Sequence, residues 1–146
     1  MSRRISAWGL VLVWVALIFR MTFKVGTESA ELSMGFVHFF DTFLRFINIS
    51  VNIDTLHLIV RKSAHITVYF FLGIWTINAL TYHALEFKEI LIIGFFFTLV
   101  IASLDETFQL FVEGRHGALM DVMFDMIGAV SGGALIFYLK WKMKLI

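Results

Sequence analysis

The chain has 146 residues, of which 60% are hydrophobic, and its mean hydropathy is +0.87. A soluble domain is about 45–50% apolar, so this composition predicts an integral membrane protein. The chain contains no cysteine, which excludes disulfides, thiol catalysis and cysteine metal sites. Its net charge is +1 and no basic run is interleaved with aromatic residues, so we expect no nucleic-acid partner. We find no internal repeat and expect a single domain over residues 1–146.

The first apolar run lies between two pairs of basic residues and predicts a transmembrane helix over about residues 6–23. A spanning helix needs ~17–25 residues, and nearby cleavage sites are poor, so we expect this helix to be retained. The long connection that follows contains a helix over about residues 31–49. Its polar residues fall at helical spacing on an otherwise aromatic cylinder, which predicts an amphipathic helix lying in the membrane interface. These residues are His38, Asp41, Thr42 and Arg45.

Three further apolar segments predict spans over about residues 63–82, 90–111 and 119–139. The expected fold class is therefore all-α, a polytopic membrane protein with an interfacial helix between the first and second of its four spans. Four spans place both termini on one side of the membrane. They place the start of the second span, the end of the third and the start of the fourth at the opposite face.

The side of the membrane does not follow from charge counts, because six basic residues fall on each side. The lysines at positions 140, 142 and 144 favour retention of the C-terminus inside the cell. Several basic residues of the opposite side have acidic neighbours with which to pair. We therefore expect cytoplasmic termini and an outward-facing polar site.

The polar and charged residues of the spans gather at those three helix ends. An ionisable residue at the centre of a spanning helix costs roughly 2.5–3.5 kcal/mol, so such a gathering predicts a use for it. Lys62, His65 and Tyr69 share one helical face, and Asp105 and Gln109 share another. The candidate site comprises Arg61, Lys62, His65, Tyr69, Asp105, Glu106, Gln109, Arg115, Asp121 and Asp125.

One face of the fourth span carries acidic residues at its start and small residues further along. Asp121, Asp125, Gly128 and Gly132 lie at i, i+4, i+7 and i+11. Small residues on such a stripe allow a neighbouring helix to approach closely. The neighbour could be a helix of the same chain or of a second copy, so a homo-oligomer stays open.

Three motifs in this region resemble the signatures of VanZ-like membrane proteins. The first reads KSAHxxxYxxLG from Lys62, the second reads DExxQ from Asp105, and the third reads RxGxxxDV from Arg115. The resemblance covers residues 61–133 closely. Asp125 departs from the family pattern, where Asn is expected, and Glu113 stands where Pro is common.

The resemblance implies a bacterial multi-pass protein of the cell membrane. The founding member of the family is associated with resistance to teicoplanin-type glycopeptide antibiotics. The resemblance therefore gives a cellular setting and leaves the reaction open.

The residues themselves leave several interpretations open. A near-balanced set of charges can form a structural salt-bridge network. Alternatively, Arg61, Lys62 and Arg115, with the other polar residues, can bind the headgroup of an anionic lipid or a lipid-linked cell-wall precursor. In a third interpretation, His65 with Asp105 or Glu106 acts as a general acid–base pair on a lipid-linked phosphate substrate.

In that third interpretation we expect Asp121 to orient the His65 ring. A metal could be held by the same histidine and acidic residues, but no spacing is diagnostic, so we predict no metal and no cofactor. Membrane lipids are the expected partners. Polar positions confined to one face argue against a transport pathway through the bundle.

Overall fold

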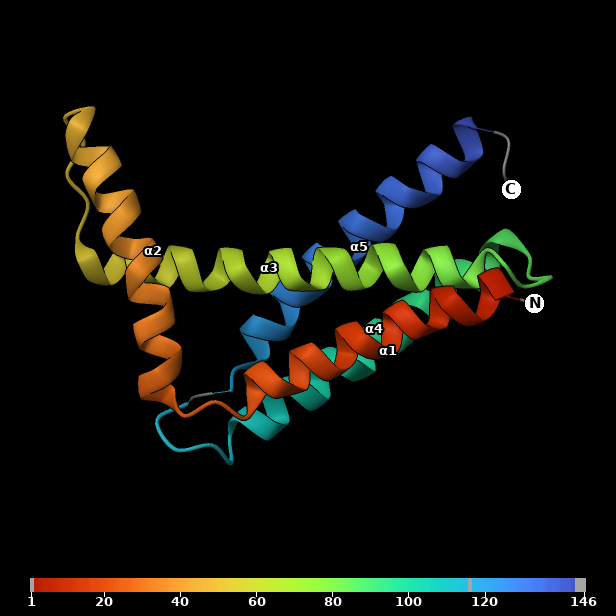
Figure 1. Ribbon diagram of the computed structural model, residues 1–146, viewed down its shortest axis with the longest axis horizontal. Coiled ribbons are helices and arrows are strands. Elements are labelled where there is room, and N and C mark those ends of the chain that lie inside the picture. Colours follow the sequence, from red (N-terminus) through yellow and green to blue (C-terminus); the bar gives the residue numbers. More distant parts are fainter. Residues whose placement is uncertain (1, 116, 144–146) are drawn as a thin grey trace.

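Five helices make up the chain in the computed structural model, which describes residues 2–115 and 117–143 (Figure 1). Four of the helices are long and apolar enough to cross a membrane, and the second helix of the chain is not among them. The described part of the chain contains no strand. The expected all-α fold with four spans is therefore confirmed. The helices are α1 (Ser2–Thr22), α2 (Gly26–Phe46), α3 (Ile53–Leu80), α4 (Phe87–Gln109) and α5 (Leu119–Lys142).

The helix α3 is longer than expected and begins at Ile53 rather than at residue 63. Asn52 caps it, because its side-chain oxygen accepts hydrogen bonds from the backbone N–H groups of Asp54 at 2.7 Å and Thr55 at 3.4 Å. The added turns place Arg61 within the helix instead of before it.

The other bounds differ less from the expected ones. α2 begins at Gly26 rather than at residue 31, and α5 continues to Lys142 rather than ending at residue 139. Lys144, one of the lysines used above to orient the chain, lies outside the described residues.

α3 is the centre of the bundle and packs against each of the other four helices. Its contact with α5 is the closest, because three glycines bring the two backbones together. A Cβ atom added at Gly128 or Gly132 of α5 would collide with the backbone carbonyl of Ile66 or Phe70, and one at Gly73 of α3 would collide with the α5 backbone. The small-residue stripe of the fourth span thus serves packing against α3 within this chain.

Both termini lie at one end of the bundle, and the α1–α2 and α4–α5 links lie at the other (Figure 1). The expected arrangement of the spans is therefore present. α2 crosses the first turns of α3 instead of running along the bundle (Figure 1). Its aromatic residues Phe39, Phe40, Phe43 and Phe46 are exposed, whereas Val37 is buried.

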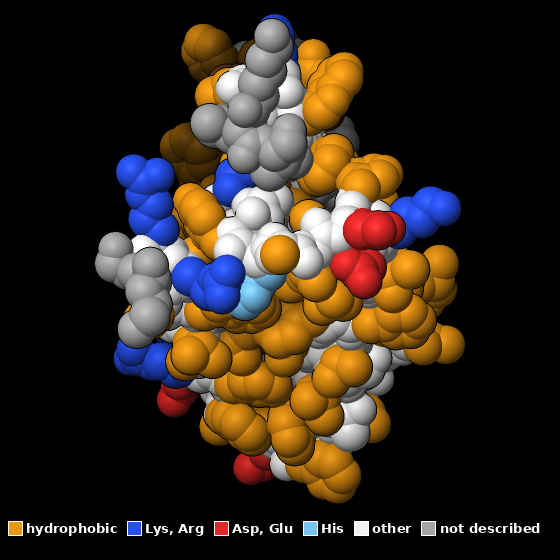
Figure 2. Space-filling model, turned by 90° about the vertical axis from the view of Figure 1, so that its right-hand side faces the viewer, with side chains coloured by type: hydrophobic (Ala, Val, Ile, Leu, Met, Phe, Trp, Pro, Cys, Tyr) orange, Lys and Arg blue, Asp and Glu red, His pale blue; other side chains and the backbone are white. Residues whose placement is uncertain are grey.

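The surface of the spans is largely apolar. Figure 2 looks at the end that carries the termini and shows many hydrophobic side chains, with Lys and Arg side chains mainly on the left of the view, one of them beside a histidine. All four membrane-spanning candidates carry large exposed hydrophobic residues, for example Leu12 on α1, Ile59 on α3, Ile92 on α4 and Met123 on α5. This is the distribution expected of helices that face lipid on their outer sides.

The packing of α5 on α3 predicts a stability difference between two glycine substitutions. Gly132→Ala places a methyl group against the Phe70 backbone carbonyl, so we expect a loss of about 1–3 kcal/mol in unfolding free energy. Gly9→Ala on α1 is the matched control, because a Cβ there meets no atom within 4 Å. Reversible unfolding in detergent, followed by circular dichroism, measures both. Equal stability of the two variants would contradict the close approach.

Candidate functional site

The bundle end opposite the termini holds a compact group of three carboxylates and one histidine. His65 from α3, Asp105 and Glu106 from α4 and Asp125 from α5 each offer an atom within 4.8 Å of the others. We call these four residues the carboxylate–histidine cluster. Asp105 and Glu106 are each 4% exposed and Asp125 is 0% exposed. Three helices therefore bury the cluster together.

His65 contacts two of the three carboxylates. Its Nδ1 lies 3.0 Å from Asp125 Oδ1 and 3.7 Å from Glu106 Oε1. We expected Asp121 to orient this ring, and the structure corrects that expectation. Asp121 instead pairs with Lys62 Nζ at 2.9 Å and with Arg61 Nη2 at 3.3 Å.

The register of α5 against α3 explains this division of partners. Gly128 faces Ile66 and Gly132 faces Phe70, so the two parallel helices advance together. Asp125 therefore lies level with His65. Asp121, one turn earlier, lies level with the basic residues one turn before the histidine.

Asp105 accepts hydrogen bonds from three neutral donors. Tyr69 donates its hydroxyl to Oδ2 at 3.1 Å, and Gln109 donates Nε2 to Oδ1 at 3.2 Å. Thr22, at the last residue of α1, also donates to Oδ1. The expected pairing of Asp105 with Gln109 on one helical face is confirmed, and Tyr69 from the first motif reaches the same carboxylate.

Glu106 joins the end of α4 to the beginning of α5. Its Oε2 accepts a hydrogen bond from the Ala118 backbone N–H at 2.9 Å, and its Oε1 accepts one from Gln109 Nε2 at 3.2 Å. Ala118 is the N-cap of α5, so the carboxylate lies at a helix N-terminus, where negative charge is stabilised. Gly117 allows this approach, because a Cβ there would collide with the Glu106 carbonyl.

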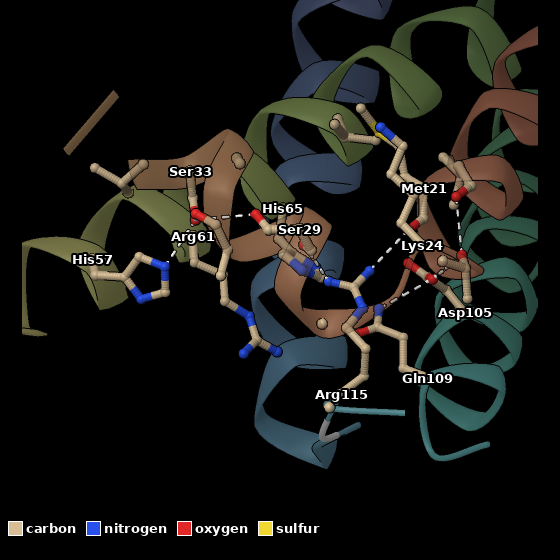
Figure 3. Close-up of a pocket in the computed structure, with 18 of the residues that line it drawn as sticks. Met21, Lys24, Ser29, Ser33, His57, Arg61, His65, Asp105, Gln109 and Arg115 are labelled. Atoms are coloured by element: carbon tan, nitrogen blue, oxygen red, sulfur yellow. Dashed lines mark hydrogen bonds between the residues drawn. The ribbon is translucent and has the colours of Figure 1, made fainter. Parts of the chain in front are cut away.

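A pocket of about 330 Å³ opens beside the cluster and lies at the lower end of the size range of ligand sites. It is enclosed by the end of α1, the start of α2, the first half of α3, the end of α4 and the loop before α5. His65, Asp105 and Gln109 lie on its wall, and so do three basic residues (Figure 3). These are Lys24, Arg61 and Arg115.

Arg115 is held in the pocket by neutral acceptors. It donates Nη1 to Ser29 Oγ at 2.8 Å and Nη2 to the Met21 carbonyl at 3.0 Å (Figure 3). Within the described part of the chain its buried Nε has no hydrogen-bond partner. Burial lowers the pKa of the Arg115 guanidinium and nearby Arg61 lowers it further, against the raising effect of Asp105 and Glu106. An arginine nevertheless stays protonated, so the pocket wall carries two neighbouring guanidinium charges.

Several residues of the pocket escaped the sequence analysis. Thr22, Lys24, Ser29, Ser33 and His57 line it, and the Ser33 hydroxyl lies 2.8 Å from His57 Nε2. Ser29 and Ser33 are four residues apart, a spacing that places both on one face of α2. That spacing was the available signal, but nothing in the sequence shows that α2 packs across α3.

A sequence profile of the VanZ/LLP1 family matches residues 7–141, which is nearly the whole chain. The chain belongs to the VanZ/LLP1 family. The VanZ-like resemblance of the three motifs is thereby confirmed, and the match extends to the first span. No curated protein and no solved structure matches the chain. The family assignment and the four apolar helices therefore support a multi-pass membrane protein.

The contact between Tyr69 and Asp105 predicts an energetic coupling. Tyr69→Phe removes a donor from a buried carboxylate, so we expect a loss of about 1–3 kcal/mol in unfolding free energy. The loss should be smaller in the Asp105→Asn background, as a double-mutant cycle in detergent measures. Tyr138→Phe, at an exposed tyrosine of α5, is the control and should change stability by less than about 0.5 kcal/mol. An equal loss in both backgrounds would show that the Tyr69 hydroxyl acts elsewhere.

Proposed function

We propose that the pocket binds the phosphate-bearing headgroup of an anionic membrane lipid or of a lipid-linked cell-wall precursor. The observation that carries this proposal is the proximity of Arg61 and Arg115 on the pocket wall, with Lys24 on the same wall. Two like charges held together in a partly buried site repel each other. A bound phosphate offsets that repulsion and accepts hydrogen bonds from both guanidinium groups.

Arg115 is the better placed of the two guanidinium groups to recognise a ligand. Its Nη atoms are positioned by Ser29 and the Met21 carbonyl, which are neutral and leave the positive charge uncompensated by those contacts. Arg61 and Lys62, by contrast, share the Asp121 carboxylate. A phosphate in the pocket therefore has one preorganised arginine and a second charge beside it.

The apolar remainder of an amphiphile also has a surface available. Ile18 and Val68 line the pocket, and Phe36 of α2 lines it while being largely exposed. The exposed aromatic side chains of α2 continue outward from Phe36. A helix with this amphipathic pattern lies in the membrane interface, where its aromatic residues contact acyl chains while the headgroup enters the pocket.

In the cell we propose that this binding contributes to resistance to teicoplanin-type lipoglycopeptides, with the pocket at the outer face of a bacterial membrane. Family membership supports the resistance role, since the founding member is associated with that phenotype. The position of the pocket opposite both termini supports the outward face, provided the termini are cytoplasmic (Figure 1). Association of copies of the chain into a homo-oligomer stays an open prediction from the sequence.

A second candidate function is acid–base catalysis on a lipid-linked phosphate. The observation in its favour is that His65 lines the pocket while its Nδ1 contacts the buried Asp125 carboxylate, an arrangement that fixes an imidazole for proton transfer. Release of phosphate from a lipid diphosphate added to the purified protein in nanodiscs, and its loss in His65→Ala, would favour this function over binding alone. A purely structural role fits best for Asp121, which is paired with Lys62 and Arg61.

Binding of an anionic lipid should depend on Arg115. In nanodiscs that contain phosphatidylglycerol and phosphatidylcholine, we expect native mass spectra of the wild-type protein to retain phosphatidylglycerol preferentially. Arg115→Ala removes a charge-assisted contact of about 1.5–3 kcal/mol, so retention should fall roughly 10–100-fold. Arg115→Lys should restore part of it, because a point charge replaces the planar fork.

The matched control for this experiment is Arg20→Ala. Arg20 lies in the last turn of α1, the end of that helix that borders the pocket, but it is exposed and does not line the pocket. Lipid retention should be unchanged in this variant. Equal retention by Arg115→Ala and Arg20→Ala, with both proteins folded, would refute a headgroup site at Arg115.

The outward orientation can be tested with single cysteines, because the chain has none of its own. Glu113 in the α4–α5 loop and Lys142 at the end of α5 are both exposed and lie at opposite ends of the bundle. We expect a membrane-impermeant maleimide to label Glu113→Cys in intact cells and Lys142→Cys only after permeabilisation. The reverse pattern would place the pocket on the cytoplasmic side.

A further inference from the structure

We propose that the carboxylate–histidine cluster is a binding site for a divalent first-row transition cation of the Mn²⁺ or Zn²⁺ type. This inference concerns the buried wall of the pocket and does not depend on lipid binding. The four candidate ligands are one imidazole nitrogen of His65 and one carboxylate oxygen each of Asp105, Glu106 and Asp125.

The spacing of these ligands suits a metal ion. Their atoms all lie within 4.8 Å of one another. With bonds of about 2.2 Å, ligands of a tetrahedral ion lie about 3.6 Å apart and opposite ligands of an octahedral ion about 4.4 Å apart, so the widest pair must contract by roughly 0.4–1.2 Å. A mixture of imidazole and carboxylate ligands favours Mn²⁺, Fe²⁺ or Zn²⁺ over a purely oxygen-binding ion.

The charge of the cluster also favours a cation. Three carboxylates are buried within a few ångströms of one another, and burial strengthens their mutual repulsion. The imidazole of His65, even when protonated, offsets one of the three charges. The ammonium of Lys62 is directed to Asp121, outside the cluster. A divalent ion offsets two negative charges at the point where they converge.

An independent observation comes from Gln109, which is not one of the four residues. Its side chain is 1% exposed, and its Oε1 has no hydrogen-bond partner within the described part of the chain. The Nε2 atom of the same amide lies 3.2 Å from Asp105 Oδ1 and 3.2 Å from Glu106 Oε1. A half-turn of the amide exchanges the two atoms and directs the oxygen into the cluster. That orientation is repulsive beside two carboxylates but favourable beside a cation, to which Oε1 would then be a further ligand, while Nε2 would take the position in which Oε1 has no partner in this structure.

Asp125 supplies a second unpartnered oxygen in the cluster. Its Oδ1 contacts His65 Nδ1 at 3.0 Å, while its buried Oδ2 has no partner among the described residues. A carboxylate oxygen that is 0% exposed and unpaired is costly unless a proton or a metal ion occupies the space beside it. Asp125 is also the position where this chain carries an acid in place of the Asn expected from the VanZ-like pattern.

Metal binding to the purified protein tests this proposal. The protein is delipidated in detergent, treated with a chelator and titrated separately with Mn²⁺ and Zn²⁺, with bound metal measured by equilibrium dialysis and elemental analysis. We expect about one equivalent of at least one metal to bind. Asp125→Asn, which preserves shape and removes the charge, should weaken that binding at least tenfold.

Asp121→Asn is the matched control, because Asp121 lies one turn from Asp125 on the same helix but outside the cluster. Its metal affinity should stay within about threefold of the wild-type value. Should Asp125→Asn fail to fold, Glu106→Gln and a metal-induced rise in the wild-type melting temperature provide the same test. Binding of less than one tenth of an equivalent of either metal, or equal affinity of the folded Asp125→Asn and wild-type proteins, would overturn the proposal. Because lipid is absent, neither outcome bears on the headgroup site at Arg115.

Discussion

The backbone contact between α3 and α5 is the constraint on which the site depends. Gly128 and Gly132 bring α5 so close to α3 that facing turns of the two helices cannot slide past each other without a steric clash. This register places Asp125 beside His65 and Asp121 beside Lys62. A packing feature in the middle of the bundle thus decides which charges meet at its end.

That register separates two kinds of electrostatic environment. Asp121 meets two basic side chains, so its charge is compensated locally, and it contributes to holding α5 on α3. Asp105 accepts instead from neutral donors, and Asp125 contacts the imidazole of His65. A uniform salt-bridge network would have distributed the basic residues over all the acids. The observed segregation leaves negative charge concentrated at the cluster and positive charge on the neighbouring pocket wall.

Much of this arrangement could be predicted from the sequence, because hydrophobic length fixes the spans and their number fixes which ends meet. The length and number of the spans are enough to predict that His65, Asp105 and Asp121 converge at one end of the bundle. The choice between Asp121 and Asp125 as the partner of His65 could not be made, since helical spacing gives faces but not the register between helices. The extent of α3 was missed for a local reason, the cap at Asn52. The contribution of α2 to the pocket was missed because it rests on tertiary contacts such as those of Ser29 and Ser33.

α2 connects the polar end of the bundle with its apolar surroundings. Ser29 at its start holds the Arg115 guanidinium, and the Gly26 backbone N–H donates to the Glu113 carbonyl in the α4–α5 loop at 2.9 Å. The same helix continues into exposed aromatic turns beyond Phe36. Movement of α2 in the membrane interface would therefore be transmitted to Arg115, while the cluster behind it is fixed by α3, α4 and α5. The pocket consequently combines an acidic wall, built by α3, α4 and α5, with Arg115, whose guanidinium is held by the helix expected to contact lipid.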